Sequence, residues 1–240
     1  MTQRSEKLLL FDVDCTLVDT GGAGITALKQ AIVEVFGGEG PPLDLAGSTD
    51  SGIVRGVFEH FGREYDPDIE AQFYEVYLPL MKKNLRDENF GGRVLDGVPE
   101  LLNDLEEAGH TLGLLTGNIE LGGLIKVAHY GLAEHFQFGS WGDDHWDRNK
   151  LGPIAIERAN EHTGLNFTAE DVIVIGDTCK DVACAQAIGA PCLAVATGSV
   201  SAADLEKCGA DLVVPDLTVS EVRPFLKLDT GSSHSCRTRR

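Results

Sequence analysis

The chain has 240 residues, 42% of them hydrophobic and 24% charged, and its formal net charge is −18. These values are typical of a globular protein with one domain, or with a domain and a modest insertion, and they exclude a disordered chain. A surface this acidic repels nucleic acid and anionic membranes at long range, so neither is expected as a partner. A site for an anionic ligand would need its own local positive field.

The start of the chain and its cysteines bear on where the protein works. The first residues are polar, and the first apolar run, Leu8 to Phe11, is too short for a signal peptide or a membrane span. The six cysteines show no CxxC pair and no metal-finger spacing. This pattern favours reduced thiols over a disulfide framework, and a cytoplasmic location is expected.

Short apolar runs bounded by turn residues recur along the chain, and helical patterns lie between them. The runs predict strands that are buried on both faces, as in a parallel sheet. Their alternation with helices predicts a doubly wound, Rossmann-like α/β core. The predicted strands are 8–13, 111–115, 171–175, 191–196 and 211–214, with 136–138 as a weaker candidate. The predicted helices of this core are 98–108, 122–129, 153–163, 182–188 and 202–208.

One long stretch breaks the alternation, because it holds helical patterns at 23–36, 49–61 and 68–85 and no convincing strand. A segment of this length predicts an α-helical cap domain inserted after the first strand. Glycine pairs flank it, and they would suit either a hinge or simple turns. The expected division is 1–21 and 92–228 for the α/β core, 22–91 for the cap, and 229–240 for a polar, flexible tail.

Acidic residues follow two of the predicted strands. Asp12 and Asp14 come directly after the first strand, and Asp177 and Asp181 follow the strand at 171–175. In open α/β sheets, ligands bind at the carboxyl ends of the strands. Close carboxylates repel one another unless something positive neutralises them, and Mg²⁺ is a hard cation that prefers oxygen ligands. The two acidic strand ends therefore predict one metal site, although Asp12 and Asp14 would also suit a turn.

Four sequence motifs occur along the chain, and they and their order resemble those of haloacid dehalogenase-like hydrolases. They are Asp-x-Asp-x-Thr from Asp12, Thr-Gly-Asn from Thr116, a basic residue before a helix, and Gly-Asp-x-x-x-Asp from Gly176. The resemblance covers most of the chain, and the phosphoglycolate-phosphatase-like branch, which has a helical cap in the same place, is the most similar. The family's third motif is usually Lys-Pro-x-Pro. Because Lys150 keeps that register with Pro153, Lys150 is preferred to Arg148 as its cation.

The resemblance implies a magnesium-dependent phosphatase that acts on a small phosphorylated metabolite. Asp12 would be the nucleophile and form an aspartyl-phosphate, and Asp14 would be the general acid and base. Mg²⁺ would be held by Asp12, the Asp14 backbone carbonyl and Asp177, with Asp181 in a supporting role. The groups implied to stabilise the phosphoryl oxygens are Lys150, Thr116, Gly117 and Asn118, with Arg148 as the alternative cation.

Two other activities of the same family stay open. A sugar-phosphate mutase shares all four motifs, whereas a 2-haloacid dehalogenase needs neither Asp14 nor Asp177. The cap stretch from Gly52 to Phe58 is mostly small or apolar, which favours a small anionic leaving group over a sugar. Within it, Arg55 could reach a substrate carboxylate, although a solvated position outside the site is the favoured interpretation. Ser48 or Asp50 is expected to cap that helix. Neither the substrate nor the oligomeric state can be predicted.

Overall fold

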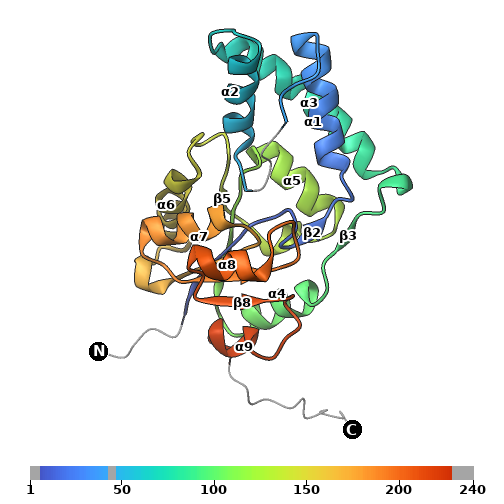
Figure 1. Ribbon diagram of the computed structural model, residues 1–240. Helices are drawn as coiled ribbons and strands as arrows, with labels where there is room; N and C mark the ends of the chain where they lie inside the picture. The colour runs from blue at the N-terminus through green and yellow to red at the C-terminus, as the bar shows by residue number, and fades with distance from the viewer. Residues whose placement is uncertain (1–5, 43–46, 229–240) are drawn as a thin grey trace.

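The main sheet has six parallel strands in the order β5-β4-β1-β6-β7-β8, as drawn in the computed structural model of Figure 1. The structure describes residues 6–42 and 47–228, so the predicted tail lies outside the described residues. β1 is central and pairs with β4 on one side and β6 on the other. The strands are β1 (Leu8–Phe11), β4 (Thr111–Leu115), β5 (Gly139–Ser140), β6 (Val172–Gly176), β7 (Cys192–Val195) and β8 (Leu212–Val214).

The two faces of this sheet bury separate apolar layers. Side chains alternate along a strand, so Leu9 and Phe11 of β1 enter one layer while Leu8 and Leu10 enter the other. Helices α4, α5 and α9 contribute to the first layer, and α6, α7 and α8 to the second, which confirms the predicted doubly wound core. The core helices are α4 (Val98–Glu107), α5 (Glu120–His129), α6 (Leu151–Thr163), α7 (Cys179–Ile188), α8 (Ala202–Cys208) and α9 (Val222–Phe225). Four short 3-10 helices accompany them: η1 (Glu88–Phe90), η2 (Ala133–His135), η3 (Arg148–Lys150) and η4 (Ala169–Asp171).

Three helices form a cap over the carboxyl ends of the strands (Figure 1): α1 (Ala23–Phe36), α2 (Asp50–His60) and α3 (Pro67–Leu85). They have an apolar core of their own, in which Phe36 and Phe58 make an edge-to-face contact. Thr49 caps α2 by accepting a hydrogen bond from the Gly52 N–H at 3.0 Å. The expectation that Ser48 or Asp50 caps this helix is therefore wrong, because Asp50 already lies in the first turn.

The chain passes between core and cap through a two-stranded antiparallel sheet that was not predicted. Its strands, β2 (Val18–Asp19) and β3 (Arg93–Val94), are too short for a periodic signal. Glycine is required at both crossings. Gly21 has φ of 60°, and a Cβ on Gly92 would lie 2.0 Å from the Tyr130 hydroxyl oxygen. Close contacts explain Gly21 and Gly92, and positive φ angles explain Gly22 and Gly91, while their use as a hinge stays a hypothesis.

Two local predictions were wrong. Residues 136–138 are not a strand, because the fifth strand begins one residue later, at Gly139. Cys179 and Cys208 form a disulfide, with Cα atoms 5.6 Å apart, instead of staying reduced. The disulfide joins the start of α7 to the end of α8, two helices that pack together although 29 residues separate the cysteines. No helix among residues 6–42 and 47–228 is long and apolar enough to cross a membrane.

Candidate active site

The register of β1 and β6 brings two predicted carboxylates together. Phe11 pairs with Ile175, so Asp12 and Asp177 follow strand ends that lie side by side. The Asp12 N–H donates to the Ile175 carbonyl at 2.9 Å, which continues the strand pairing into the site. Asp12 and Asp177 are 5% and 4% exposed. The sequence therefore placed both of them correctly at one edge of the sheet.

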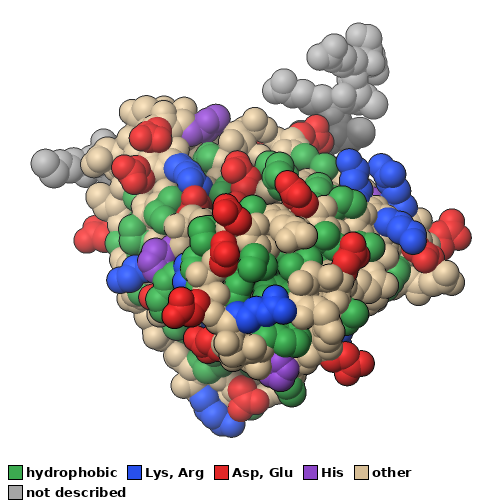
Figure 2. Space-filling model, turned by 90° about the horizontal axis from the view of Figure 1, so that it is seen from above, with side chains coloured by type: hydrophobic (Ala, Val, Ile, Leu, Met, Phe, Trp, Pro, Cys, Tyr) green, Lys and Arg blue, Asp and Glu red, His purple; other side chains and the backbone are tan. Residues whose placement is uncertain are grey.

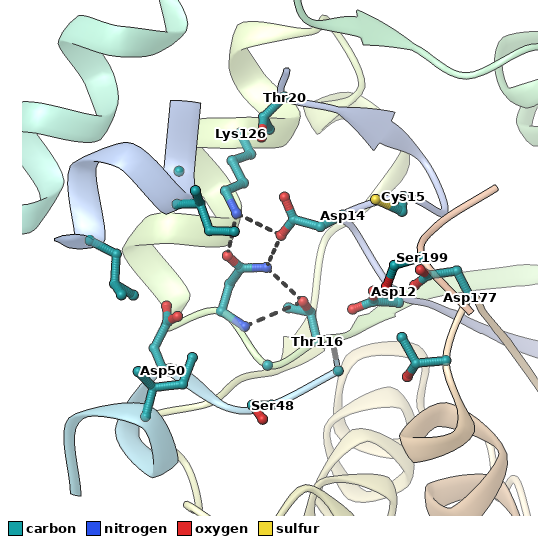
Figure 3. Close-up of a pocket in the computed structure, with 18 of the residues that line it drawn as sticks. Asp12, Asp14, Cys15, Thr20, Ser48, Asp50, Thr116, Lys126, Asp177 and Ser199 are labelled. Carbon is teal, nitrogen blue, oxygen red and sulfur yellow. Dashed lines mark hydrogen bonds and ion pairs between the residues drawn. The ribbon is translucent and has the colours of Figure 1, made fainter. Parts of the chain in front are cut away.

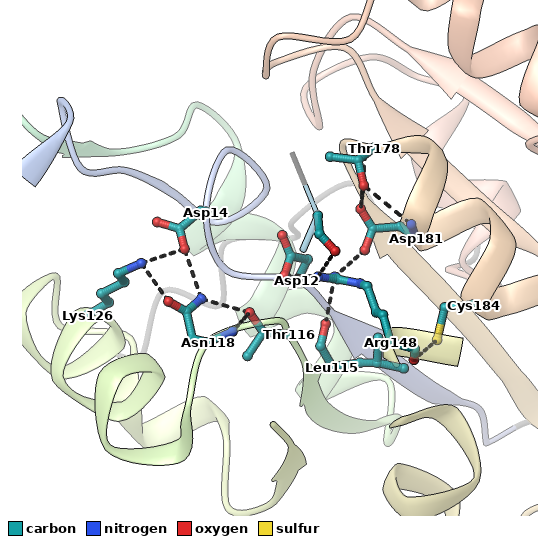
Figure 4. A network of polar contacts seen from close by, with 11 residues as sticks. Asp12, Asp14, Leu115, Thr116, Asn118, Lys126, Arg148, Thr178, Asp181 and Cys184 are labelled. Carbon is teal, nitrogen blue, oxygen red and sulfur yellow. Dashed lines mark hydrogen bonds and ion pairs between the residues drawn. The ribbon is translucent and has the colours of Figure 1, made fainter. Parts of the chain in front are cut away.

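Arg148 holds two of the buried carboxylates in one network (Figure 4). Its Nη2 donates to Asp12 Oδ1 at 3.0 Å and also to Asp181 Oδ1. The other oxygen of Asp181 accepts from the backbone N–H of Thr178 at 3.0 Å and from its hydroxyl at 2.7 Å. Asp181 thus has both oxygens occupied, whereas Asp12 Oδ2 accepts no hydrogen bond from the described part of the chain.

The choice of Lys150 over Arg148 as the third-motif cation is not supported by the geometry. Lys150 is exposed at the end of η3 and precedes α6, while Arg148 is 6% exposed and contacts Asp12 directly. The Lys-x-x-Pro register suggested the lysine. The 3-10 turn from Arg148 to Lys150 instead directs the earlier residue into the site.

The acidic cluster fits a hard divalent cation. One oxygen each of Asp12, Asp177 and Asp181 lie within 4.8 Å of one another, and all three residues are buried. Burial raises the pKa of Asp177 to about 9, and the nearby charges of Asp12 and Asp181 add to this effect. Burial also raises the pKa of Asp12 to about 6, although Arg148 opposes it. Buried carboxylates with such raised pKa values need more positive charge than Arg148 supplies, and a metal ion would provide it.

A second network, next to the first, contains a lysine that the sequence did not reveal. Lys126 of α5 donates from Nζ to Asp14 Oδ2 and to Asn118 Oδ1, both at 2.6 Å. Asn118 also donates to Asp14 Oδ2 and to the Thr116 hydroxyl, each at 2.8 Å. The Asp14 carboxylate therefore belongs to this network (Figure 4), while Lys126 is itself 4% exposed.

The hydrophobic pattern of α5 gave no sign of this lysine. Leu121 and Leu124 are 60% and 37% exposed, whereas Gly122, Gly123, Lys126 and Val127 are buried. The helix therefore exposes two leucines and buries a lysine, which departs from the usual amphipathic order. A glycine pair four and three residues before a lysine was the one available signal.

The segment before α2 binds the cap to the core at the site. The Asp50 N–H donates to the Gly117 carbonyl at 2.7 Å, and Arg148 Nη1 donates to the Gly47 carbonyl at 3.1 Å. A Cβ on Gly117 would lie 2.0 Å from the Ser48 carbonyl oxygen, so only glycine allows this approach. The glycine of the Thr-Gly-Asn motif thus serves the contact between core and cap.

A cavity of about 320 Å³ lies between cap and core and is lined by both networks (Figure 3). Arg55 does not line it. Its guanidinium lies over the Tyr65 ring at 3.9 Å, so the prediction that it stays outside the site holds. Figure 2 looks down on the cap end and shows acidic side chains spread between apolar ones. The positive groups of the site are therefore inside it, as an acidic protein requires for an anionic ligand.

A parallel, Rossmann-like core with buried carboxylates at adjacent strand ends, and a helical cap above them, is the architecture of a hydrolase with a cap domain. A family model described as haloacid dehalogenase-like hydrolase matches residues 9–195, and the chain belongs to this family.

Known relatives agree with this assignment. Phosphoglycolate phosphatase of Chromobacterium violaceum is 27% identical over 95% of this chain and 99% of its own. The enzyme of the same name from Nitrosospira multiformis is 24% identical over 88% of this chain and 92% of its own. The crystal structure of a predicted phosphatase from Clostridium acetobutylicum has a TM-score of 0.68 at 24% identity, over 93% of this chain and 99% of that one. The predicted superfamily and branch are thus confirmed.

Proposed function

We propose that the protein is a magnesium-dependent phosphatase that hydrolyses a small phosphate monoester through an aspartyl-phosphate on Asp12. One observation carries the proposal: Asp12 lies at the end of the central strand, with Oδ1 bound by Arg148 and Oδ2 without a donor among the described residues. A carboxylate held in this way is oriented for in-line attack on phosphorus. Phosphatase names among the relatives support the same chemistry.

Two residues prepare the nucleophile. Arg148 neutralises part of the charge of Asp12, and Asp181 positions the guanidinium by accepting a hydrogen bond from the same nitrogen, Nη2. During transfer, the guanidinium lies beside the developing charge of the phosphoryl oxygens and stabilises it. We assign Arg148 this role in place of Lys150, while Asp181 positions the guanidinium.

Asp12 and Asp177 would hold Mg²⁺ together with the Asp14 backbone carbonyl. When bound, the ion would neutralise phosphoryl charge as a Lewis acid. Asp181 would not be a direct ligand in this assignment, because Arg148 and Thr178 occupy both of its oxygens.

Asp14 would transfer the protons. It protonates the leaving alkoxide and then removes a proton from the water that attacks the aspartyl-phosphate. Lys126 and Asn118 both bind Asp14 Oδ2, which leaves Oδ1 for this exchange. The hydroxyl of Thr116 and the backbone N–H groups near Gly117 would bind the phosphoryl oxygens.

A small phosphorylated metabolite is the proposed ligand, and a cytoplasmic location and the absence of nucleic-acid and membrane partners stay predictions. The disulfide removes the reduced-thiol argument for the cytoplasm.

Proteins described as β-phosphoglucomutase, such as the one from Clostridium difficile, share the fold with a TM-score of 0.69 at 15% identity, over 92% of this chain and 97% of that one. The choice between phosphatase and mutase therefore needs an experiment.

The test follows the fate of the phosphoryl group in heavy-oxygen water with magnesium present. Net release of inorganic phosphate carrying one solvent oxygen, with Asp12 unlabelled, is expected. Asp12→Asn should abolish release, and excess chelator should abolish it reversibly. Isomerised sugar phosphate without free phosphate would identify a mutase. Label in Asp12 would mean that water attacks the acyl carbon, as in a dehalogenase.

A further inference from the structure

The cavity has two halves with different chemistry. Asp12, Asp177 and Arg148 surround the half proposed for the phosphoryl group. The other half lies between the cap helices and α5, and Asp50, Tyr77 and Lys126 are among the polar groups that line the cavity. Figure 3 shows Asp50 and Lys126 on the same side of the cavity, away from Asp12 and Asp177. A leaving group attached to the phosphoryl group would occupy this side.

Asp50 offers an acceptor that no protein group uses. It is 7% exposed, and its Oδ2 accepts from the Ile119 N–H at 3.0 Å. Its Oδ1 accepts no hydrogen bond from residues 6–42 or 47–228. Asp50 lines the cavity, so a donor on the ligand can bind this oxygen.

Tyr77 offers a donor in the same region. Its side chain is 2% exposed, its ring stacks on Phe73, and its hydroxyl has no hydrogen-bond partner in the described part of the chain. Burial raises its pKa well above the ordinary value, and Asp50 and Asp14 raise it further, so the phenol keeps its proton. Tyr77 lines the cavity together with Asp50 and Lys126.

Lys126 adds a second donor. Its ammonium has three N–H groups, of which two are used by Asp14 and Asn118. A Cβ on Gly24 would lie 3.4 Å from Nζ and 4.0 Å from the Tyr77 hydroxyl. Gly24 of α1 therefore leaves the space beside both donors open.

We propose that these groups select an uncharged leaving group that bears hydroxyls, such as a polyol or sugar, with Asp50 as the specificity-determining residue. A hydroxyl donates and accepts at once, so it can donate to Asp50 while it accepts from Tyr77 or Lys126. A carboxylate can only accept, and the charge of Asp50 repels it. This inference rests on the proposed phosphatase activity and names its substrate class.

This proposal differs from the expectation of a small anionic leaving group. That expectation came from the stretch between Gly52 and Phe58, of which only Ile53 lines the cavity. The polar groups that face the ligand come instead from the first residue of α2, from α3 and from α5. These residues are far apart in the sequence, so the sequence alone does not show that they lie around one cavity.

Two matched pairs of phosphate esters test the proposal. The first pair is 2-hydroxyethyl phosphate and 2-phosphoglycolate, which differ in a hydroxymethyl group against a carboxylate. The second pair is glycerol 1-phosphate and propyl phosphate, which differ only in hydroxyls. In each pair the hydroxylated ester should have a kcat/KM about tenfold higher or more in the wild type.

The variants Asp50→Asn and Tyr77→Phe should lower the glycerol-to-propyl ratio, by about tenfold and about threefold or more. Asp50→Asn should also raise the relative rate on 2-phosphoglycolate, because it removes the repelling charge. Asp68→Asn, at an exposed position in the same cap, is the matched control and should leave both ratios unchanged.

The outcomes separate this inference from the proposed function. A wild type that prefers 2-phosphoglycolate, or ratios that neither variant changes, would overturn the assignment of the pocket while phosphatase activity stands. Absence of phosphate release from all four esters with magnesium would overturn the proposed function, and the inference with it.

Discussion

At the scale of single residues, the third-motif cation gives a clear test. Arg148→Ala should lower kcat/KM by about a hundredfold or more, because it removes a preorganised cation beside Asp12. Lys150→Ala, two residues later and exposed, should change it less than about threefold. Steady-state kinetics on one phosphate ester, with circular dichroism to verify folding, compares the two. If Lys150→Ala loses most of its activity instead, Lys150 is the third-motif cation, as the motif register predicted.

The buried charge of Asp50 should lower the free energy of unfolding. Burial raises its pKa from 3.8 to about 6, although Lys126 and the Ile119 N–H oppose this, and Asp14 and Asp143 contribute in the same direction. The folded state therefore binds the proton more tightly than the unfolded state. The free energy of unfolding should fall as pH rises from about 4 to about 6 and stay lowered above that range.

Asp50→Asn removes this penalty. The variant should be more stable than the wild type by roughly 1–3 kcal/mol at pH 7, and the difference should shrink towards zero near pH 4. Urea unfolding of both proteins across this range measures the difference, in which other titrating groups such as Asp12 cancel. A difference that is constant with pH would show that Asp50 does not titrate as described.

At the scale of elements, the disulfide ties two neighbouring helices together. Cys208→Ser should lower the free energy of unfolding by about 3–4 kcal/mol, the chain-entropy value for a loop of this length. Thermal unfolding with and without reductant measures the effect. Reductant should destabilise the wild type and leave the variant unchanged. Equal numbers of reactive thiols in denatured wild type before and after reduction would show that the bond does not form.

The sequence predicted elements well where a pattern was long. Helix α1 begins and ends at the predicted residues, and so do β4 and α8. The two-residue strands β2 and β3 lie outside the reach of any periodicity, and they form only because the crossings meet in space. In α5 the pattern was misleading, since Lys126 is buried by contacts with Asp14 and Asn118 that no local window contains.

At the scale of the whole molecule, strand order decides how much of the site was predictable. Asp12 and Asp177 follow long apolar runs, so any parallel sheet with adjacent β1 and β6 brings them together. Asp50 enters from the cap, and no sequence pattern fixes where a cap rests on its core. The carboxylates of the half proposed for the phosphoryl group could therefore be predicted from the sequence, whereas its cation Arg148 and the half proposed for the leaving group required the structure.

Metal binding should be visible in the stability of the whole chain, because the cluster of Asp12, Asp177 and Asp181 forms only in the folded state. A ligand that binds only the folded state stabilises it by RT ln(1 + [L]/Kd). Magnesium at about a hundred times its Kd should therefore add roughly 2–3 kcal/mol to the free energy of unfolding.

Asp177→Asn separates the ion from general salt effects. Without metal, the variant should unfold at a higher temperature than the wild type, because a carboxyl whose pKa is raised to about 9 by burial is removed. With magnesium it should gain little, whereas the wild type gains the full increment. Glu157→Gln, exposed on α6, is the matched control and should respond as the wild type does. Thermal unfolding of the three proteins, each in chelator and in magnesium, gives six unfolding temperatures. Equal increases on adding magnesium for wild type and Asp177→Asn would place the ion elsewhere.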